Sequence, residues 1–378
     1  MKKIVRILIL CLGCIIACGL LPACSSAIEE PESGGRSDGS TVTLTIQAAV
    51  PGTTTRADAT SIPEREQIDR LRIIVIDKAT NNVEYNSLLN FPNRDGSSYN
   101  IEVTKNGTKQ VYFLANTESL TNLSSLPSKG QTWDGTTVDN YVLHSLPEGR
   151  LPFTSKYEIE VKEEDVAATC YIAIAAIKFS LDFTNKTGSN IKVKSLKISS
   201  IADRSYLLPH LNSKDDWNEW ITSVTSNDNN PKPYITAYSI PEDTQHKEFE
   251  VKVENTTTGT GNGDETEDAT ENTSDDSSFT VATNETYTFD SFYCHESKFI
   301  LQGEIEQHYS IQFEIGNKTY YGVIKGLESL IRSTHVIIHI NINKLDDNPG
   351  NIVVWGTITP WTEDPAVEGG LEEVTPEP

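Results

Sequence analysis

The hydrophobic residues of this chain follow three distinct patterns. Close to the N-terminus, an unbroken apolar run, Ile7–Leu21, follows a short basic start. Across Thr41–Val50 apolar and polar residues alternate strictly, which predicts a β-strand with one buried face. Ile68–Asp77 is apolar at most positions, which is typical of a central strand covered on both faces. The inward side of the alternating strand is expected to consist of Val42, Leu44, Ile46, Ala48 and Val50.

Strand-like patterns continue to the C-terminus and predict an all-β protein with few short helices. Thr117–Leu126 is expected to be one of those helices. We also expect Tyr171–Phe183 to pair with Ile191–Ile201 across the turn Asn185–Asn190. The further expected strands are Tyr99–Thr104, Gln110–Ala115, Glu285–Phe292, Phe299–Gln302, Tyr309–Ile315, Lys318–Ile324, Arg332–Asn343 and Ile352–Trp361.

The N-terminal segment has the organisation of a secretory signal peptide, residues 1–23. Its apolar run is short for a membrane span, and no stop-transfer pattern follows. Leu21-Pro22-Ala23-Cys24 resembles a bacterial lipobox, so Cys24 is the expected lipidation site. Ile16-Ala17-Cys18 is a competing match that leaves a shorter apolar run.

Composition divides the mature chain further. Residues 24–40 are acidic and contain Gly and Pro, which predicts a flexible tether. About 355 mature residues suit two domains, which we place at 41–166 and 167–378. Residues 255–278 are a low-complexity run of Thr, Gly, Asn, Asp and Glu, expected to be a disordered insertion in the second domain.

Charge and cysteine usage exclude several classes of protein. The mature chain keeps 28 of the 31 basic residues against 54 acidic ones. With that balance and no basic patch, nucleic acid is not an expected partner. Only Cys170 and Cys294 lie outside the export segment, which is too few for a disulfide framework. One bridge between them is possible, although we favour burial as small apolar residues.

Motifs for catalysis, cofactors and metals are weak, so we expect neither an enzyme nor a bound cofactor or metal. Gly35–Gly39 fits a nucleophile-elbow string but lies in the tether. His335 and His339 are four residues apart, which on a strand separates them by roughly 13 Å and does not suit zinc. Both are expected to be exposed. The acidic residues of the insertion lack the spacing of a calcium loop.

Several segments, in this order, resemble the Bacteroidales fimbrillins, the major subunits of type V pili. The alternating strand Thr41–Val50 is followed by Thr54-Thr55-Arg56-Ala57 and then by Ile68–Asp77, as at the start of those proteins. Further similar segments are Ala175–Phe179, Ser291–Ser297, Ile331–Val336 and Asn351–Trp361. Ser297 and Ser333 stand where the family usually has Asn, and His335 stands near its usual Tyr.

The resemblance implies two tandem transthyretin-like β-sandwich domains and assembly by strand exchange. An arginine-specific protease then cuts the exported lipoprotein between Arg56 and Ala57 and releases Thr41–Val50. A C-terminal strand of a neighbouring subunit fills the vacated groove. The acidic residues after Cys24 resemble a signal for the outer face of the outer membrane, which implies a surface location in a fimbrium. The implied donor strand, residues 351–361, contains Ile352, Val354, Trp355, Ile358 and Trp361.

Two other functions are compatible with the sequence. A tip or accessory adhesin of the same fold binds a host ligand and needs no donor strand. A surface glycan-binding lipoprotein is the third hypothesis, because the chain has five Trp residues, whose side chains could form a sugar-binding platform. In β-sandwiches, however, Trp lies more often in the core or in an interface.

Overall fold

The computed structural model describes residues 40–50, 62–92, 96–123, 125–210, 239–251, 278–297, 301–302, 305–306, 309–324, 327, 330–345 and 352–360. All of them belong to one compact unit, Gly39–Pro378. The strands up to residue 206 are β1 (Thr41–Ala49), β2 (Arg70–Asp77), β3 (Asn82–Asn90), β4 (Ser97–Thr104), β5 (Gly107–Ala115), β6 (Val142–Leu143), β7 (Phe153–Val161), β8 (Val166–Tyr171), β9 (Ala173–Ile174), β10 (Ile177–Asn185), β11 (Ile191–Ala202) and β12 (Ser205–Tyr206). The later strands are β13 (His246–Glu250), β14 (Phe279–Val281), β15 (Thr286–Cys294), β16 (Leu301–Gln302), β17 (Ile305–Glu306), β18 (Ser310–Ile315), β19 (Lys318–Val323), β20 (Thr334–Ile342) and β21 (Ile352–Pro360).

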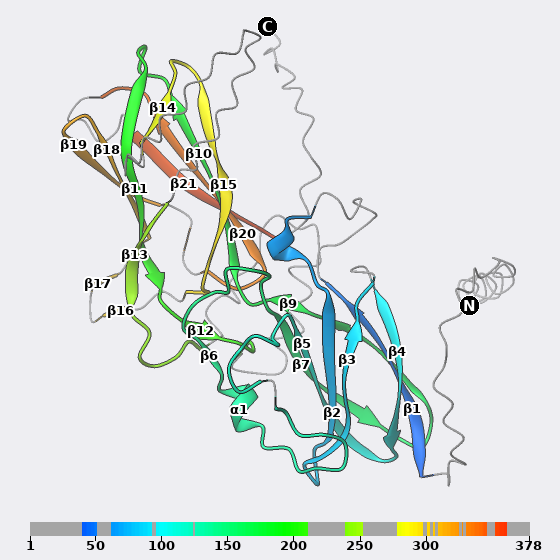
Figure 1. Ribbon diagram of the computed structural model, residues 1–378. Helices are drawn as coiled ribbons and strands as arrows, with labels where there is room; N and C mark the ends of the chain where they lie inside the picture. Colours follow the sequence, from blue (N-terminus) through cyan, green and yellow to red (C-terminus); the bar gives the residue numbers. More distant parts are fainter. Residues whose placement is uncertain are drawn as a thin grey trace, which may run out of the picture. The chain divides into compact units, whose positions relative to one another are not determined.

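The fold is all-β and of the sandwich type, which confirms the predicted fold class (Figure 1). Helical structure in the described ranges is limited to the 3-10 turn η1 (Glu64–Glu66) and the single-turn helix α1 (Thr136–Asp139). Neither has the length or the apolar character that a membrane-crossing helix needs.

The first core lies between two sheets. One sheet has the strand order β4-β1-β8, and the facing sheet has the order β3-β2-β5-β7-β9. Leu44 and Ile46 of β1 pack in one cluster with Ile101 of β4, Ile73 of β2 and Phe113 of β5. The strands of both sheets therefore share one apolar interior.

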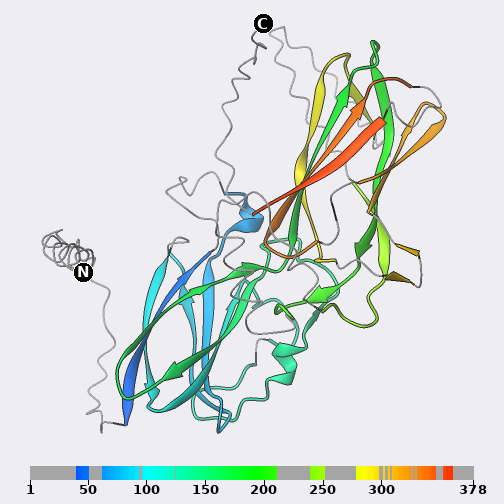
Figure 2. The ribbon, with the colours of Figure 1, turned by 180° about the vertical axis from the view of Figure 1, so that it is seen from behind.

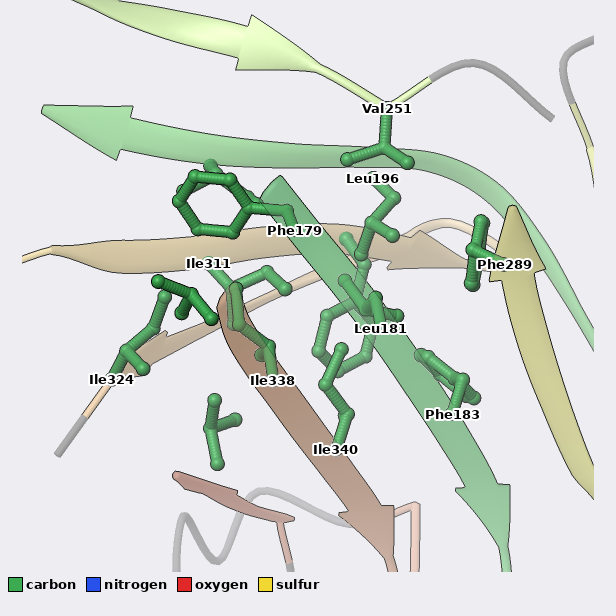
Figure 3. Packing of buried hydrophobic residues seen from close by; sticks show 14 of the residues in the cluster. Phe179, Leu181, Phe183, Leu196, Val251, Phe289, Ile311, Ile324, Ile338 and Ile340 are labelled. Atoms are coloured by element: carbon green, nitrogen blue, oxygen red, sulfur yellow. The ribbon is translucent and has the colours of Figure 1, made fainter. Parts of the chain in front are cut away.

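The second core has the same layered construction. Its sheets have the orders β15-β10-β20-β21 and β13-β11-β18-β19, and β14 pairs with β11. Figure 3 shows Phe179, Leu181 and Phe183 of β10 among Ile338 of β20 and Ile311 of β18. These residues alternate along their strands, so the period-two pattern places one face of each sheet in this core.

A third apolar cluster explains why β2 is apolar on both faces. Ile73 and Val75 point into the first core, whereas Ile74 and Ile76 join a cluster with Val138 of α1 on the other side of the sheet. The prediction that this strand is covered on both faces is therefore confirmed.

Three sequence-based expectations about local structure are wrong. Residues 117–123 form successive turns instead of a helix, with Asn116 and Asn122 at φ of 55° and 69°. Tyr171–Phe183 is not one strand, because the chain leaves the first core along β8 and β9 and enters the second along β10. Strands β10 and β11 do not pair; they lie in the two facing sheets of the second core.

The division into domains at residue 166 stays a prediction. In the structure, Cys170, Ile172 and Ile174 pack in the first core, and Ile177 packs in the second. The expected tether, except Ser40, and almost all of the expected insertion lie outside the described residues.

Candidate functional site: the buried first strand

Strand β1 lies in the middle of its sheet and has a partner on each side (Figure 2). It runs antiparallel to β4, with Thr41 opposite Thr104 and Ala48 opposite Ser97. It runs parallel to β8, with Leu44 opposite Val166 and Ala49 opposite Tyr171. Its backbone is thus bonded along both edges, and β4 and β8 form the two walls of the position that β1 occupies.

The side chains of β1 follow the predicted alternation. Leu44, Ile46 and Ala48 are 0% exposed, and Val42 and Val50 are 8% and 7% exposed. Gln47, on the opposite face, is exposed. The inward orientation of the five apolar residues is confirmed, whereas the removal of this strand stays a prediction.

Residues 51–61, which connect β1 to η1, lie outside the described residues, and so do Arg56, Ala57 and Cys24. The structure describes the chain again from Ile62, and η1, which begins two residues later, is bound to β10 and β15 through Glu66. Glu66 is 1% exposed; its carboxylate lies 3.2 Å from the Lys178 ammonium and accepts a hydrogen bond of 2.8 Å from the Tyr293 hydroxyl. Sequence reasoning missed this attachment, because Glu66 is separated from its partners by more than a hundred residues.

Arg65 is held in the same region. Its guanidinium donates hydrogen bonds to the carbonyl oxygens of Pro147 (2.6 Å) and Gly149 (3.3 Å) and lies 4.7 Å from the centre of the Tyr293 ring. Burial and the nearby Glu66 carboxylate raise the pKa of Tyr293. An arginine engaged in this way is a poor substrate for a protease, which needs an extended and accessible backbone.

The C-terminal strand β21 is an edge strand. Among the described strands its only ladder partner is β20, along Thr334–Ile342. Val354 is 5% exposed, whereas Val353 is 44% exposed and Trp355 stacks on His339 with ring centres 5.0 Å apart. Ile358 pairs with Val336 in the ladder, and Trp361 lies outside the described residues.

Two motifs of the fimbrillin resemblance meet in the structure. Glu296, just after β15, accepts hydrogen bonds from Arg332, just before β20, and these residues are 3% and 1% exposed. Arg332 also donates to the carbonyl oxygens of Leu207 (2.7 Å) and Tyr206 (2.6 Å). This buried ion pair joins three chain segments, and spacing in the sequence alone did not indicate it.

The remaining candidate residues do not form a second site. Cys170 and Cys294 are buried free thiols, as favoured, and burial raises the pKa of Cys170 to about 12. His335 is 3% exposed, so the prediction that it is exposed is wrong: its Nε2 lies 2.7 Å from Ser180 Oγ on the neighbouring strand.

No group of potential metal ligands occurs within the described ranges. Trp133 is buried, and Trp217 and Trp220 lie outside those ranges.

His295 should make the stability of the protein depend on pH. It is 8% exposed, its Nδ1 lies 2.9 Å from Ser205 Oγ, and burial lowers its pKa to about 4 from 6.5. Between these pH values the unfolded chain binds more protons than the folded chain, so stability is lost as pH falls. We expect this group to lower the free energy of unfolding by about 3 kcal/mol between pH 7 and pH 4.

Urea denaturation at several pH values measures this effect. His295→Asn keeps a polar atom near Ser205 and should reduce the slope of stability against pH in that range. An unchanged slope in the variant would show that other groups cause the acid sensitivity.

Comparison with known proteins places the fold among fimbrial proteins. No protein-family model and no curated protein sequence matches the chain. The tip fimbrial protein Mfa3 from Porphyromonas gingivalis, solved with a C-terminal truncation, aligns with a TM-score of 0.50 and 12% identity over 85% of this chain and 100% of that chain. The chain therefore shares the fold of a fimbrial protein, and the resemblance read from the sequence is confirmed at that level.

Two further solved structures align with lower scores. A candidate cell adhesion protein from Parabacteroides distasonis has a TM-score of 0.49 and 12% identity, over 86% of this chain and 98% of that chain. A fimbrilin from Porphyromonas gingivalis has a TM-score of 0.45 and 13% identity, over 85% of this chain and 98% of that chain.

Proposed function

We propose that this chain is a structural subunit of a cell-surface fimbria in which β1 gives way to a strand of a neighbouring copy. The central position of β1 carries the proposal. A strand bonded along both edges, with its apolar face at 0% exposure at Leu44, Ile46 and Ala48, leaves a long apolar groove when it departs. The fold shared with the tip fimbrial protein Mfa3 supports a place in a fimbria.

The energy of β1 burial explains why the groove needs an occupant. Full burial of an aliphatic side chain contributes about 1.5–3 kcal/mol, so the five inward residues together contribute on the order of 10 kcal/mol as an upper value. An empty groove also leaves the inner edges of β4 and β8 without a ladder partner. Main-chain hydrogen bonds with a replacement strand then supply affinity, and its inward side chains fix the register.

Strand β21 is the proposed donor. Both β1 and β21 have nine residues, which matches the number of ladder positions. Among the described strands, β21 has β20 as its ladder neighbour on one edge, whereas the position of β1 has a ladder neighbour on both edges. Moving from an edge to a central position therefore increases the number of backbone hydrogen bonds that the strand makes.

Maturation is proposed to be a cut between Arg56 and Ala57 by an arginine-specific protease. Limited digestion should yield a chain beginning at Ala57, and electron microscopy should then show fibres. Arg65, with its guanidinium bonded to Pro147 and Gly149, should be cut more slowly. N-terminal sequencing identifies the cut.

Matched variants make this experiment decisive. Arg56→Gln should remain uncut and form no fibres, whereas Arg65→Gln should be matured normally. A variant without residues 351–378 should be matured but should not donate a strand, so it should stop fibre growth when mixed with the intact protein. Fibres that grow equally well with the truncated subunit would favour a tip or accessory adhesin.

Export is proposed to occur as a lipoprotein anchored in the outer membrane through Cys24. Two acyl chains are the number that stable anchoring needs. Labelled palmitate should enter the precursor but not its Cys24→Ala variant. Persistent label in that variant points to Cys18 instead.

A further inference from the structure

Strands β4 and β8, the two walls of the β1 position, need other contacts to stay ordered when β1 leaves. Among the described strands, β1 is the only ladder partner of β4 and of β8. When β1 leaves, eight residues of β4 and six of β8 lose that partner. Unless something else holds them, an incoming strand has to order both walls before it can pair, and this ordering opposes binding.

The end of β4 is tied to the facing sheet by buried charged residues. Glu84 of β3 is 6% exposed and accepts hydrogen bonds from the backbone N–H of Thr104 (3.2 Å) and from its hydroxyl. Lys109 of β5 is 0% exposed, and its ammonium donates to Thr104 Oγ1 (2.6 Å), Glu84 Oε1 (2.9 Å) and Asp77 Oδ2 (2.7 Å). We call Asp77, Glu84, Thr104 and Lys109 the β4 clamp.

The chain geometry at this end strengthens the attachment. Only Lys105 and Asn106 separate β4 from β5, although the two strands belong to facing sheets. Asn106 and Gly107 have φ values of 55° and 141°, and Gly reaches such values without steric cost. At the start of β4, the Tyr99 hydroxyl donates to the carbonyl of Asn90 at the end of β3 (2.7 Å).

The end of β8 is tied to the facing sheet by Tyr157. The hydroxyl of Tyr157 in β7 accepts a hydrogen bond from the backbone N–H of Tyr171 (2.8 Å) and donates one to the carbonyl of the same residue (3.0 Å). We call this pair the β8 clamp. The chain then continues directly into β9, which pairs with β7 in the facing sheet.

We infer that the β4 clamp and the β8 clamp hold the walls of the vacated groove in place, so that it is preformed for a strand of a second copy of this chain. None of the clamp hydrogen bonds involves β1, so they persist when β1 leaves. A buried ion pair adds little net stability over apolar side chains of equal volume, but its geometry is specific. Lys109, Glu84 and Tyr157 are therefore positioning residues, an inference that rests on the proposed strand exchange.

The test uses the full chain with Ile46→Asp in β1, cut between β1 and η1 by arginine-specific protease or at an inserted protease site. The charge weakens the resident strand, so a fluorescent peptide with the sequence of Thr41–Val50 can replace it. Fluorescence anisotropy gives the association rate, and hydrogen exchange reports the protection of β4 and β8 before the peptide is added.

The clamps are removed separately in that background. Tyr157→Phe deletes one oxygen and leaves no buried charge, and Glu84→Gln weakens the β4 clamp. Each should slow peptide association at least 10-fold and abolish the protection of the wall that it holds. Glu118→Gln and Tyr321→Phe, at exposed positions away from the groove, are the matched controls and should change neither quantity.

The outcomes separate this inference from the proposed function. If the peptide does not bind to the cut chain with intact clamps, strand exchange itself is refuted. If it binds there and equally fast to both clamp variants, with the walls still protected, the groove does not depend on the clamps and the inference is wrong. A clamp substitution could also destabilise the protein without affecting the groove. It would then lower the melting temperature of the uncut chain with native β1, but the cut chain would bind the peptide at the parent rate. That result also counts against the inference.

Discussion

Replacing Ile46 by Asp should lower the free energy of unfolding by about 4 kcal/mol or more, because it removes a buried side chain and places a carboxylate in its site. Ile46 is 0% exposed and lies in one apolar cluster with Ile101 of β4 and Phe113 of the facing sheet. The described residues that form this cluster are apolar, so none of them offers the new charge a partner. Urea denaturation monitored by near-ultraviolet circular dichroism measures the loss.

The neighbouring residue supplies the control. Gln47 is exposed, so Gln47→Asp should change the free energy of unfolding by less than about 1 kcal/mol. Hydrogen exchange should show that Ile46→Asp exposes the amides of β1, while the second core keeps its protection. Equal losses of unfolding free energy in the two variants would mean that the inward side chains of β1 contribute little to stability. A replacement strand would then gain little by burying its side chains in the groove.

Replacing Arg332 by Ala should destabilise the protein by about 3–5 kcal/mol, because Glu296 then remains as a buried charge without its partner. The change also removes the donor to the carbonyl oxygens of Tyr206 and Leu207. Both members of the pair are at most 3% exposed, so water does not compensate for the loss. Thermal and urea denaturation of the purified variant measure the effect.

Two further variants separate the contribution of charge from that of packing. The double variant Arg332→Met with Glu296→Leu should lose less stability than Arg332→Ala, since no buried charge remains. Lys197→Ala breaks an ion pair with Glu248 whose side chains are 33% and 55% exposed, and it should cost no more than about 1 kcal/mol. A loss in Arg332→Ala as small as in Lys197→Ala would mean that the buried pair does not hold these segments together.

The two buried charged groups have different places in the proposed mechanism. The Arg332–Glu296 pair joins the end of β15 to the start of β20, the two strands that flank β10 in their sheet. It should contribute equally to stability before and after maturation. The Lys109–Glu84 pair touches β4, a wall of the groove, and should matter most when β1 is absent. The first therefore affects global stability, and the second affects the rate of strand capture.

The sequence by itself determined the class of the fold and the faces of its strands. Strict alternation along Thr41–Val50 was sufficient to predict which side chains are buried, because successive side chains of a strand point to opposite faces. The apolar character of Ile68–Asp77 predicted a strand covered on both faces, and the structure has two clusters there. Both signals are local, so no knowledge of the partner strands was needed.

Only the tertiary structure decided which strands are neighbours and which polar residues meet. The two-residue period reports that one face is buried but does not identify the sheet that covers it, which is why β10 and β11 were paired wrongly. Glu66 with Lys178, Glu84 with Lys109 and Glu296 with Arg332 are joined across strands distant in sequence. Such contacts arise when two sheets close over a core, and the burial that makes these charges important exists only in the folded chain.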